Sequence, residues 1–408
     1  MIRDLTDTTT TEVSKTLVRL RNDVGAMALG RVLTLIVVVD DADASEAIEV
    51  ANHASRQHPC RIIVLIAGER RGRSRLDAQI RLGGDAGASE IVVLRLYGPL
   101  AKHGPSVVVP LLLPDSPIVA WWPGHAPDDV ANDPIGAMAQ RRITDAAQHR
   151  SSRLLLKKRA ETYRPGDTDL SWTRITRWRG LLAAALDQPP YETVTAAVVS
   201  GAPDSPSTDL LAAWLAHRLK VPVQRVATPR GSGISAVRLE RKNGPIDLVR
   251  PGDVVATLSQ PGQPDRRLTL HRREAGDILA DELRRLDPDD SYEEALLLGM
   301  EKLTPVRLSA EQAARTGKAP NPDHSRRLAA RLRRDDSAKE AMAMVTAPPA
   351  PGTSKTAQVR SATRRKLAGE PTPREKKATE EAGEKATEKA SEKESKSKRT
   401  TPTKKASS

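Results

Sequence analysis

The sequence has a single cysteine, Cys60, and no phenylalanine among its 408 residues. One cysteine cannot form an intrachain disulfide, and it excludes metal sites built from several thiolates. Aromatic residues are scarce, with five Trp and four Tyr. We therefore expect a core of Val, Ile, Leu and Ala, in which the position of each tryptophan is informative.

The sequence also lacks long apolar runs. The longest, at 35–39 and 107–113, are far shorter than the ~20 residues that span a bilayer. The first residues include Asp4 and Asp7, where a signal peptide needs positive charge and then an apolar stretch. We expect a cytoplasmic protein without a membrane segment.

The net charge of +13 is concentrated at the C-terminal end. Residues 325–408 hold 22 basic and 11 acidic side chains, which leaves 43 basic and 41 acidic for residues 1–324. The body is thus close to neutral, so a basic groove for nucleic acid is not favoured. The lysines of the tail could bind nucleic acid through counterion release, but no aromatic side chain lies between them to stack on a base.

The first 150 residues predict an α/β domain with a mainly parallel sheet. Two β-branched runs at 31–39 and 61–66 are apolar at nearly every position, as in strands buried on both faces. A helix with one small-residue face lies between them, which makes a βαβ unit. Further elements are expected as a helix after the capping box at 9–12, strands at 78–82, 91–96 and 118–122, and a helix at 136–147.

A polar segment at 151–168 predicts a linker, and residues 169–305 predict a second α/β domain. Its helices are expected from 169 or 171 to 186 and at 208–220, 275–286 and 292–302, with a strand at 194–199. The period then changes to two at 236–241 and 246–250, around Lys242-Asn243-Gly244-Pro245, which indicates an antiparallel hairpin. Strands at 254–259 and 267–271 follow it.

The remaining residues predict no folded domain. Residues 306–345 predict a helical or irregular extension. Residues 346–408 have no aromatic and few aliphatic side chains, so they cannot bury enough apolar surface to offset the entropy of ordering. We expect this tail, rich in Lys, Glu, Ser, Thr and Pro, to be disordered.

No catalytic set is visible. The eight histidines lack the spacing of metal ligands, and no cofactor-binding loop of established pattern follows a strand. We therefore expect no metal, no cofactor and no enzymatic activity. Asp167-Thr168-Asp169 and Asp287-Pro288-Asp289 could suggest a metal-dependent transferase, but each precedes an expected helix, where capping explains it.

The alternative of a sugar-phosphate or nucleotide-binding enzyme depends on residues 200–208, which join a strand to a helix N-terminus. Backbone N–H groups and the helix dipole could hold an anion there. The candidate anion-binding residues are Ser200, Gly201, Ser207 and Thr208. Simple helix capping by Ser207 or Asp209 explains the same pattern.

Tryptophan and arginine form two clusters that could bind a partner. Trp121 and Trp122 end a strand, and because alternate side chains face opposite sides, one layer cannot cover both rings. The second cluster interleaves Trp and Arg on one expected helix, the residue types most enriched at binding hot spots. Core packing is the alternative for both clusters. The candidate partner-binding residues are Trp121, Trp122, Trp172, Arg174, Trp178 and Arg179.

Several short motifs, in this order, resemble those of the OpcA family of glucose-6-phosphate dehydrogenase assembly proteins. They lie at 28–35, 58–61, 83–90, 96–100, 118–124 and 165–174, with Trp178-Arg179 after them. The resemblance covers residues 1 to about 305 and leaves out the tail.

This resemblance implies a non-enzymatic allosteric activator and a partner, glucose-6-phosphate dehydrogenase. The chain would promote the active oligomer of that enzyme and so feed NADPH production in the oxidative pentose phosphate pathway. A single Cys60 cannot form an intramolecular dithiol switch. The resemblance assigns no ligand residues.

Overall fold

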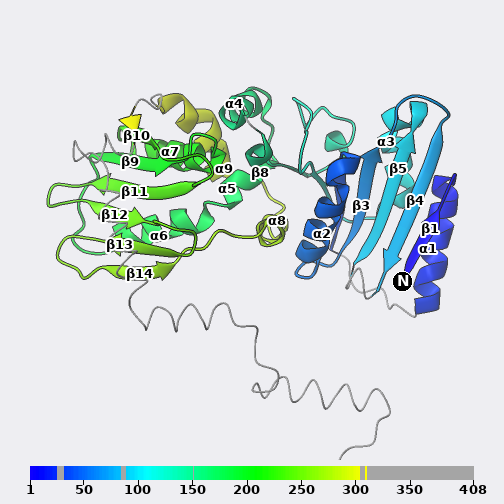
Figure 1. The fold of residues 1–408 in the computed structure, drawn as a ribbon, viewed down its shortest axis with the longest axis horizontal. Helices are drawn as coiled ribbons and strands as arrows, with labels where there is room; N and C mark the ends of the chain where they lie inside the picture. The colour runs from blue at the N-terminus through cyan, green and yellow to red at the C-terminus, as the bar shows by residue number, and fades with distance from the viewer. Residues whose placement is uncertain (25–31, 84–88, 150, 304–307, 310–408) are drawn as a thin grey trace, which may run out of the picture. The chain divides into compact units, whose positions relative to one another are not determined.

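The computed structural model describes residues 1–24, 32–83, 89–149, 151–303 and 308–309. These residues form two β-sheets with helices packed on them (Figure 1). All of them lie within one compact unit, Met1–Arg331. The predicted disordered tail and most of the predicted extension at 306–345 lie outside the described residues.

The first sheet has eight strands in the order β1-β4-β5-β3-β2-β6-β7-β8. Five of its seven pairings are parallel, and those of β4 with β1 and with β5 are antiparallel. The predicted mainly parallel sheet is confirmed. The strands are β1 (Ile2–Leu5), β2 (Leu33–Val39), β3 (Cys60–Ala67), β4 (Arg75–Leu82), β5 (Glu90–Tyr97), β6 (Ile118–Trp121), β7 (Arg141–Thr144) and β8 (Asp167–Asp169).

Helices cover both faces of this sheet, which explains why β2 and β3 are apolar at nearly every position. One face packs against α2 (Ala44–Ser55) and α8 (Ala275–Leu283). The other packs against α1 (Thr10–Val24) and α3 (Gly104–Val108). A Cβ on Gly276 of α8 would lie 2.7 Å from the ring of His53 on α2, so the two helices meet closely only because this position is a glycine.

The second sheet is mostly antiparallel, with four antiparallel and two parallel pairings among seven strands. The predicted hairpin is confirmed as β11 and β12, and Gly244 in its turn has a φ of 119°. The strand order is β14-β13-β12-β11-β9-β10-β15. The bounds are β9 (Ala196–Gly201), β10 (Val223–Ala227), β11 (Ile234–Glu240), β12 (Ile246–Val249), β13 (Val255–Ser259), β14 (Arg266–Thr269) and β15 (Leu308–Ser309).

One apolar core joins this sheet to its helices. It contains Trp172, Trp178 and Tyr292 with aliphatic side chains of the strands. The expected helix from 169 or 171 to 186 is divided in two, because a turn interrupts it between α5 and α6. The helices are α4 (Ser152–Thr162), α5 (Leu170–Thr173), α6 (Thr176–Leu186), α7 (Pro206–Leu219) and α9 (Asp290–Glu294).

The helix predicted at 136–147 is wrong. The segment contains a short 3-10 turn at Gly136–Met138, strand β7 and another turn at Ala146–Gln148. Arg141 and Arg142 are buried in β7, where Arg141 pairs with Glu282 and Arg142 with Asp167. In the sequence, two adjacent arginines indicate an exposed polar segment. Their burial is tolerable only because carboxylates from distant parts of the chain pair with them.

The segment predicted as a linker, 151–168, contains α4 and most of β8. Leu156 of α4 packs into the core of the second sheet, while β8 pairs with β7 in the first sheet. The segment therefore contributes to both sheets. The predicted domain boundaries at 150 and 169 remain a prediction.

Candidate functional site

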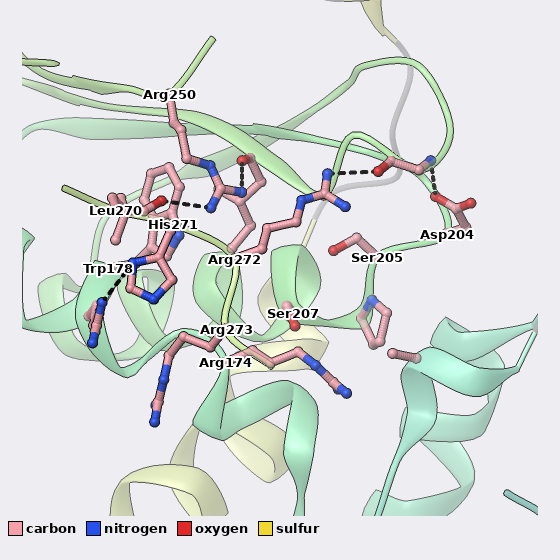
Figure 2. Close-up of a pocket in the computed structure, with 16 residues that line it drawn as sticks. Arg174, Trp178, Asp204, Ser205, Ser207, Arg250, Leu270, His271, Arg272 and Arg273 are labelled. Carbon is pink, nitrogen blue, oxygen red and sulfur yellow. Dashed lines mark hydrogen bonds between the residues drawn. The ribbon is translucent and has the colours of Figure 1, made fainter. Parts of the chain in front are cut away.

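A pocket of about 330 Å³ lies at the carboxyl ends of the parallel strands β9 and β10. Ligand crevices form at this edge of open sheets because the loops after neighbouring strands diverge there. The loop after β9 leads into α7, and Gly231 and Gly233 follow β10. Figure 2 shows Arg174, Arg250, Arg272 and Arg273 around this space.

Ser205 begins α7 by accepting a hydrogen bond from the N–H of Thr208 at 3.3 Å. Pro206 occupies the first helical position, where its missing N–H costs nothing. The expectation that Ser207 or Asp209 caps this helix is therefore wrong. The side chain of Asp209 instead accepts from the buried guanidinium of Arg225 at 2.8 Å.

Of the four candidate anion-binding residues, Ser207 lines the pocket, and its hydroxyl donates to the carbonyl of Ser171 at 2.9 Å. Ser200, Gly201 and Thr208 are buried beside the pocket. A Cβ on Gly201 would lie 2.5 Å from Oγ1 of Thr208, so the strand approaches the helix this closely only with glycine. The three residues shape the loop, and their role in binding an anion remains a prediction.

Five arginines line the pocket, against one carboxylate, Asp204. Three of them bind carboxylates outside the lining at 2.6–2.8 Å: Arg174 with Asp145, Arg272 with Asp253, and Arg273 with Asp281. Arg177 lies 3.4 Å from Nδ1 of His271. Within the described residues, neither Arg177 nor Arg250 has a carboxylate at salt-bridge distance.

Arg250 is 6% exposed. Its Nη1 donates to the carbonyl of Leu270 at 3.1 Å and its Nη2 to that of Ile234 at 2.9 Å. Its Nε has no hydrogen-bond partner in the described part of the chain. Burial, and then the charge of Arg272, lower the pKa of Arg250 to about 10. The charge of Asp253 acts in the opposite direction. Arg250 therefore remains charged at neutral pH, with no carboxylate at salt-bridge distance among the described residues.

The candidate partner-binding residues divide between this pocket and other places. Arg174 and Trp178 line the pocket, so the structure brings part of the Trp-Arg cluster next to Ser207. Trp172 and Arg179 line a separate cavity of about 550 Å³. There the guanidinium of Arg179 lies 3.7 Å from the ring centroid of Trp172, and burial lowers the pKa of Arg179 to about 10.

Trp121 and Trp122 face opposite sides of the first sheet, as alternation along the strand predicts. Trp121 packs on the α2 side and is 2% exposed, while Trp122 packs on the α3 side and is 1% exposed. Trp172 and Trp178 are also buried. All four rings are thus core side chains in this structure, and a contact with a partner remains a prediction for them.

Capping explains both Asp-x-Asp triplets. Asp169 accepts from the N–H of Ser171 at 2.9 Å and caps α5. Burial, and then the charge of Asp145, raise the pKa of the Asp169 carboxyl. Asp289 accepts from the N–H of Tyr292 at 3.0 Å and from Nε1 of Trp172 at 2.8 Å.

Replacing Asp289 with alanine should lower the free energy of unfolding by about 1–2 kcal/mol, because it removes a helix cap and the partner of an indole N–H. Asp287→Ala is the matched control in the same triplet, since that side chain is exposed. Its expected effect is below about 0.5 kcal/mol. Urea denaturation measures both, and equal losses would contradict the capping role.

Within the described residues, no three His, Cys, Asp or Glu side chains gather into a possible metal site. None of the helices described is long and apolar enough to cross a bilayer.

Two family models match the chain in succession. Residues 51–161 match the N-terminal domain of a glucose-6-phosphate dehydrogenase subunit, and residues 165–296 match the C-terminal domain of that subunit. The chain belongs to the OpcA family. This family comprises the non-catalytic subunits that assemble and activate glucose-6-phosphate dehydrogenase. The resemblance seen in the sequence motifs is confirmed.

Comparisons with other proteins add little to the family assignment. No curated protein matches the chain. Among solved structures, an oxidoreductase from Sinorhizobium meliloti has 10% identity and a TM-score of 0.31, and covers 71% of this chain and 90% of its own. GenD2 from gentamicin A biosynthesis, in complex with NAD, has 13% identity and a TM-score of 0.31. The match covers 71% of this chain and 96% of the GenD2 chain. Likeness at this level supports no conclusion about activity.

Arg250, Arg272 and Arg273 are pocket residues that the sequence did not indicate. Arg250 ends an expected strand, and the other two follow the strand expected at 267–271. Nothing local in the sequence shows that these positions meet the loop after β9. The Gly-Ser-Gly segment at 231–233 is the one nearby signal.

Proposed function

We propose that this chain binds glucose-6-phosphate dehydrogenase and stabilises its active oligomer without performing chemistry itself. One observation carries the proposal: models of both domains of the dehydrogenase subunit match the chain in order, over 51–161 and 165–296. In this role the chain acts in the cytoplasm and supports NADPH production by the oxidative pentose phosphate pathway.

Activation requires a difference in affinity. A protein that binds the active and inactive oligomers equally well shifts no population, however tightly it binds. A shift from 1% to 99% active enzyme needs about 10⁴-fold tighter binding to the active form. The chain must therefore contact a surface that differs between the two states of the enzyme.

Titrating the purified dehydrogenase with the chain should raise its activity to a plateau and increase its mass in solution at the same ratio of the two proteins. Activity assays and light scattering after size-exclusion chromatography measure the two effects. The chain without the dehydrogenase should show no turnover. Unchanged activity and mass at saturating chain would contradict the proposal.

Among the six candidate contact residues, the arginines have accessible surface while the tryptophans are buried. We keep Arg174, whose side chain is 24% exposed, and Arg179 as contact candidates. Repeating the titration with Arg179→Gln, after circular dichroism confirms its fold, tests this choice. A curve equal to that of the wild type would remove Arg179 from the contact.

A further inference from the structure

The pocket at the carboxyl ends of β9 and β10 is lined by more positive than negative side chains. Its lining includes five arginines and a single carboxylate, that of Asp204. Asp204 accepts from the N–H of Gly231 at 3.4 Å. Arg177 and Arg250 have no carboxylate at salt-bridge distance within the described residues. Arg272 lines the pocket as well, with Nε on Asp253 and Nη2 on the carbonyl of Gly231.

Arg250 is the strongest indication that the pocket suits an anion. A buried charge is costly unless a counter-charge compensates it, and this side chain is 6% exposed. The carbonyls of Leu270 and Ile234 satisfy hydrogen bonds of Nη1 and Nη2 but carry no net charge. Its Nε is buried and unpartnered in the described part of the chain. An anion in the pocket would supply the missing counter-charge.

The backbone around the pocket also favours an anion. The N-terminus of α7, a helix of 14 residues, opens on it, and helix N-termini carry partial positive charge. Gly233 has a φ of 62°, and a Cβ there would lie 3.4 Å from Nη2 of Arg272 and 3.8 Å from Nη2 of Arg250. Gly233 therefore lies next to both guanidinium groups, which Figure 2 labels as Arg250 and Arg272.

The size and walls of the pocket define the class of ligand. A volume of about 330 Å³ lies at the lower end of the range for small-molecule sites. Trp178, Leu270, Ile234 and Pro206 add apolar wall beside the arginines. Guanidinium groups match the oxygens of phosphate in pairs, which favours phosphate over a halide ion. The apolar wall favours an ester with a carbon body over the free anion.

We propose that this pocket binds a small phosphate monoester, with Arg177, Arg250 and Arg272 around the phosphate group. Arg250 provides the buried charge at the base of the site, and Arg177 and Arg272 provide exposed charges at its rim. The site belongs to this chain alone and needs no dehydrogenase.

Calorimetry on the full-length chain, in a buffer free of phosphate and sulfate, tests the proposal. Glucose 6-phosphate serves as the probe ester, inorganic phosphate as the free anion and glucose as the uncharged body. We expect saturable binding of the ester, at least several-fold weaker binding of inorganic phosphate, and no heat from glucose. Absence of binding by the ester would overturn the site. Equal affinity for inorganic phosphate would overturn the assignment to a monoester.

Arg177→Gln and Arg272→Gln should each weaken binding of the ester about 10-fold, since each removes a charged hydrogen bond. Both side chains are exposed, so the fold should tolerate the change. Arg267→Gln is the matched control, because Arg267 is exposed on β14 and outside the pocket lining. Wild-type affinity in both pocket variants, or an equal loss in Arg267→Gln, would overturn the site. Because these measurements omit the dehydrogenase, their failure would leave the activation proposal standing.

Discussion

Replacing Asp209 with alanine is expected to lower the free energy of unfolding by about 3–5 kcal/mol, because it leaves a buried guanidinium without its counter-ion. The side chains of Arg225 and Asp209 are 1% and 2% exposed, and their Nε and Oδ1 atoms lie 2.8 Å apart. Arg225 also donates to the carbonyl of Ala202 at 3.2 Å, in the loop between β9 and α7. The loss should therefore loosen that loop as well.

Urea denaturation followed by circular dichroism measures this loss. The control is Asp41→Ala, which breaks an exposed pair with Arg95 whose side chains are 68% and 38% exposed. Exposed pairs contribute about 0–1 kcal/mol, so the control should change stability little. If the two variants lost equal stability, the buried pair would contribute no more than an exposed one.

Replacing Trp122 with alanine is expected to cost about 3–5 kcal/mol, the range for removing a large aromatic side chain from a core. The ring is 1% exposed and packs with Val107, Val108 and Leu111 on one face of the first sheet. The buried residues of this cluster are otherwise aliphatic, so removing the ring leaves a cavity. The expected result is a lower urea midpoint with little change in the slope.

Tyr191→Ala is the control, since this side chain is 78% exposed and should change stability by less than about 0.5 kcal/mol. The dehydrogenase titration separates the two roles of Trp122. A folded Trp122→Phe variant that activates normally would assign the ring to the core alone. Reduced activation with unchanged stability would instead support a contact with the partner.

The central strands of the first sheet follow from local signals, whereas β1, β7 and β8 were not predicted. The runs that form β2 and β3 are apolar at nearly every position, which is typical of strands buried on both faces. The hairpin of β11 and β12 was equally clear, since alternation on both sides of Asn243-Gly244 leaves one register. Family membership followed from short motifs, which need no structure to be compared.

Strand β7 and helix α4 were missed because their burial depends on residues far away in the chain. Arg141 in β7 is 2% exposed, and its partner Glu282 lies on α8. Leu156 of α4 is fully buried in the core of the second sheet, although its own segment is polar. Neither partner could be identified from the neighbouring sequence.

By itself the sequence determined the class of the fold, the family and the mainly aliphatic core without phenylalanine, because composition, periodicity, turn residues and motifs can be read from the chain alone. Only the tertiary structure decided that Arg250 and Arg272 meet the N-terminus of α7, and that Trp121 and Trp122 are covered on both faces of the sheet. The charge and the burial of a site depend on segments that are far apart in the sequence and meet only when the chain folds. A local sequence pattern therefore cannot predict them.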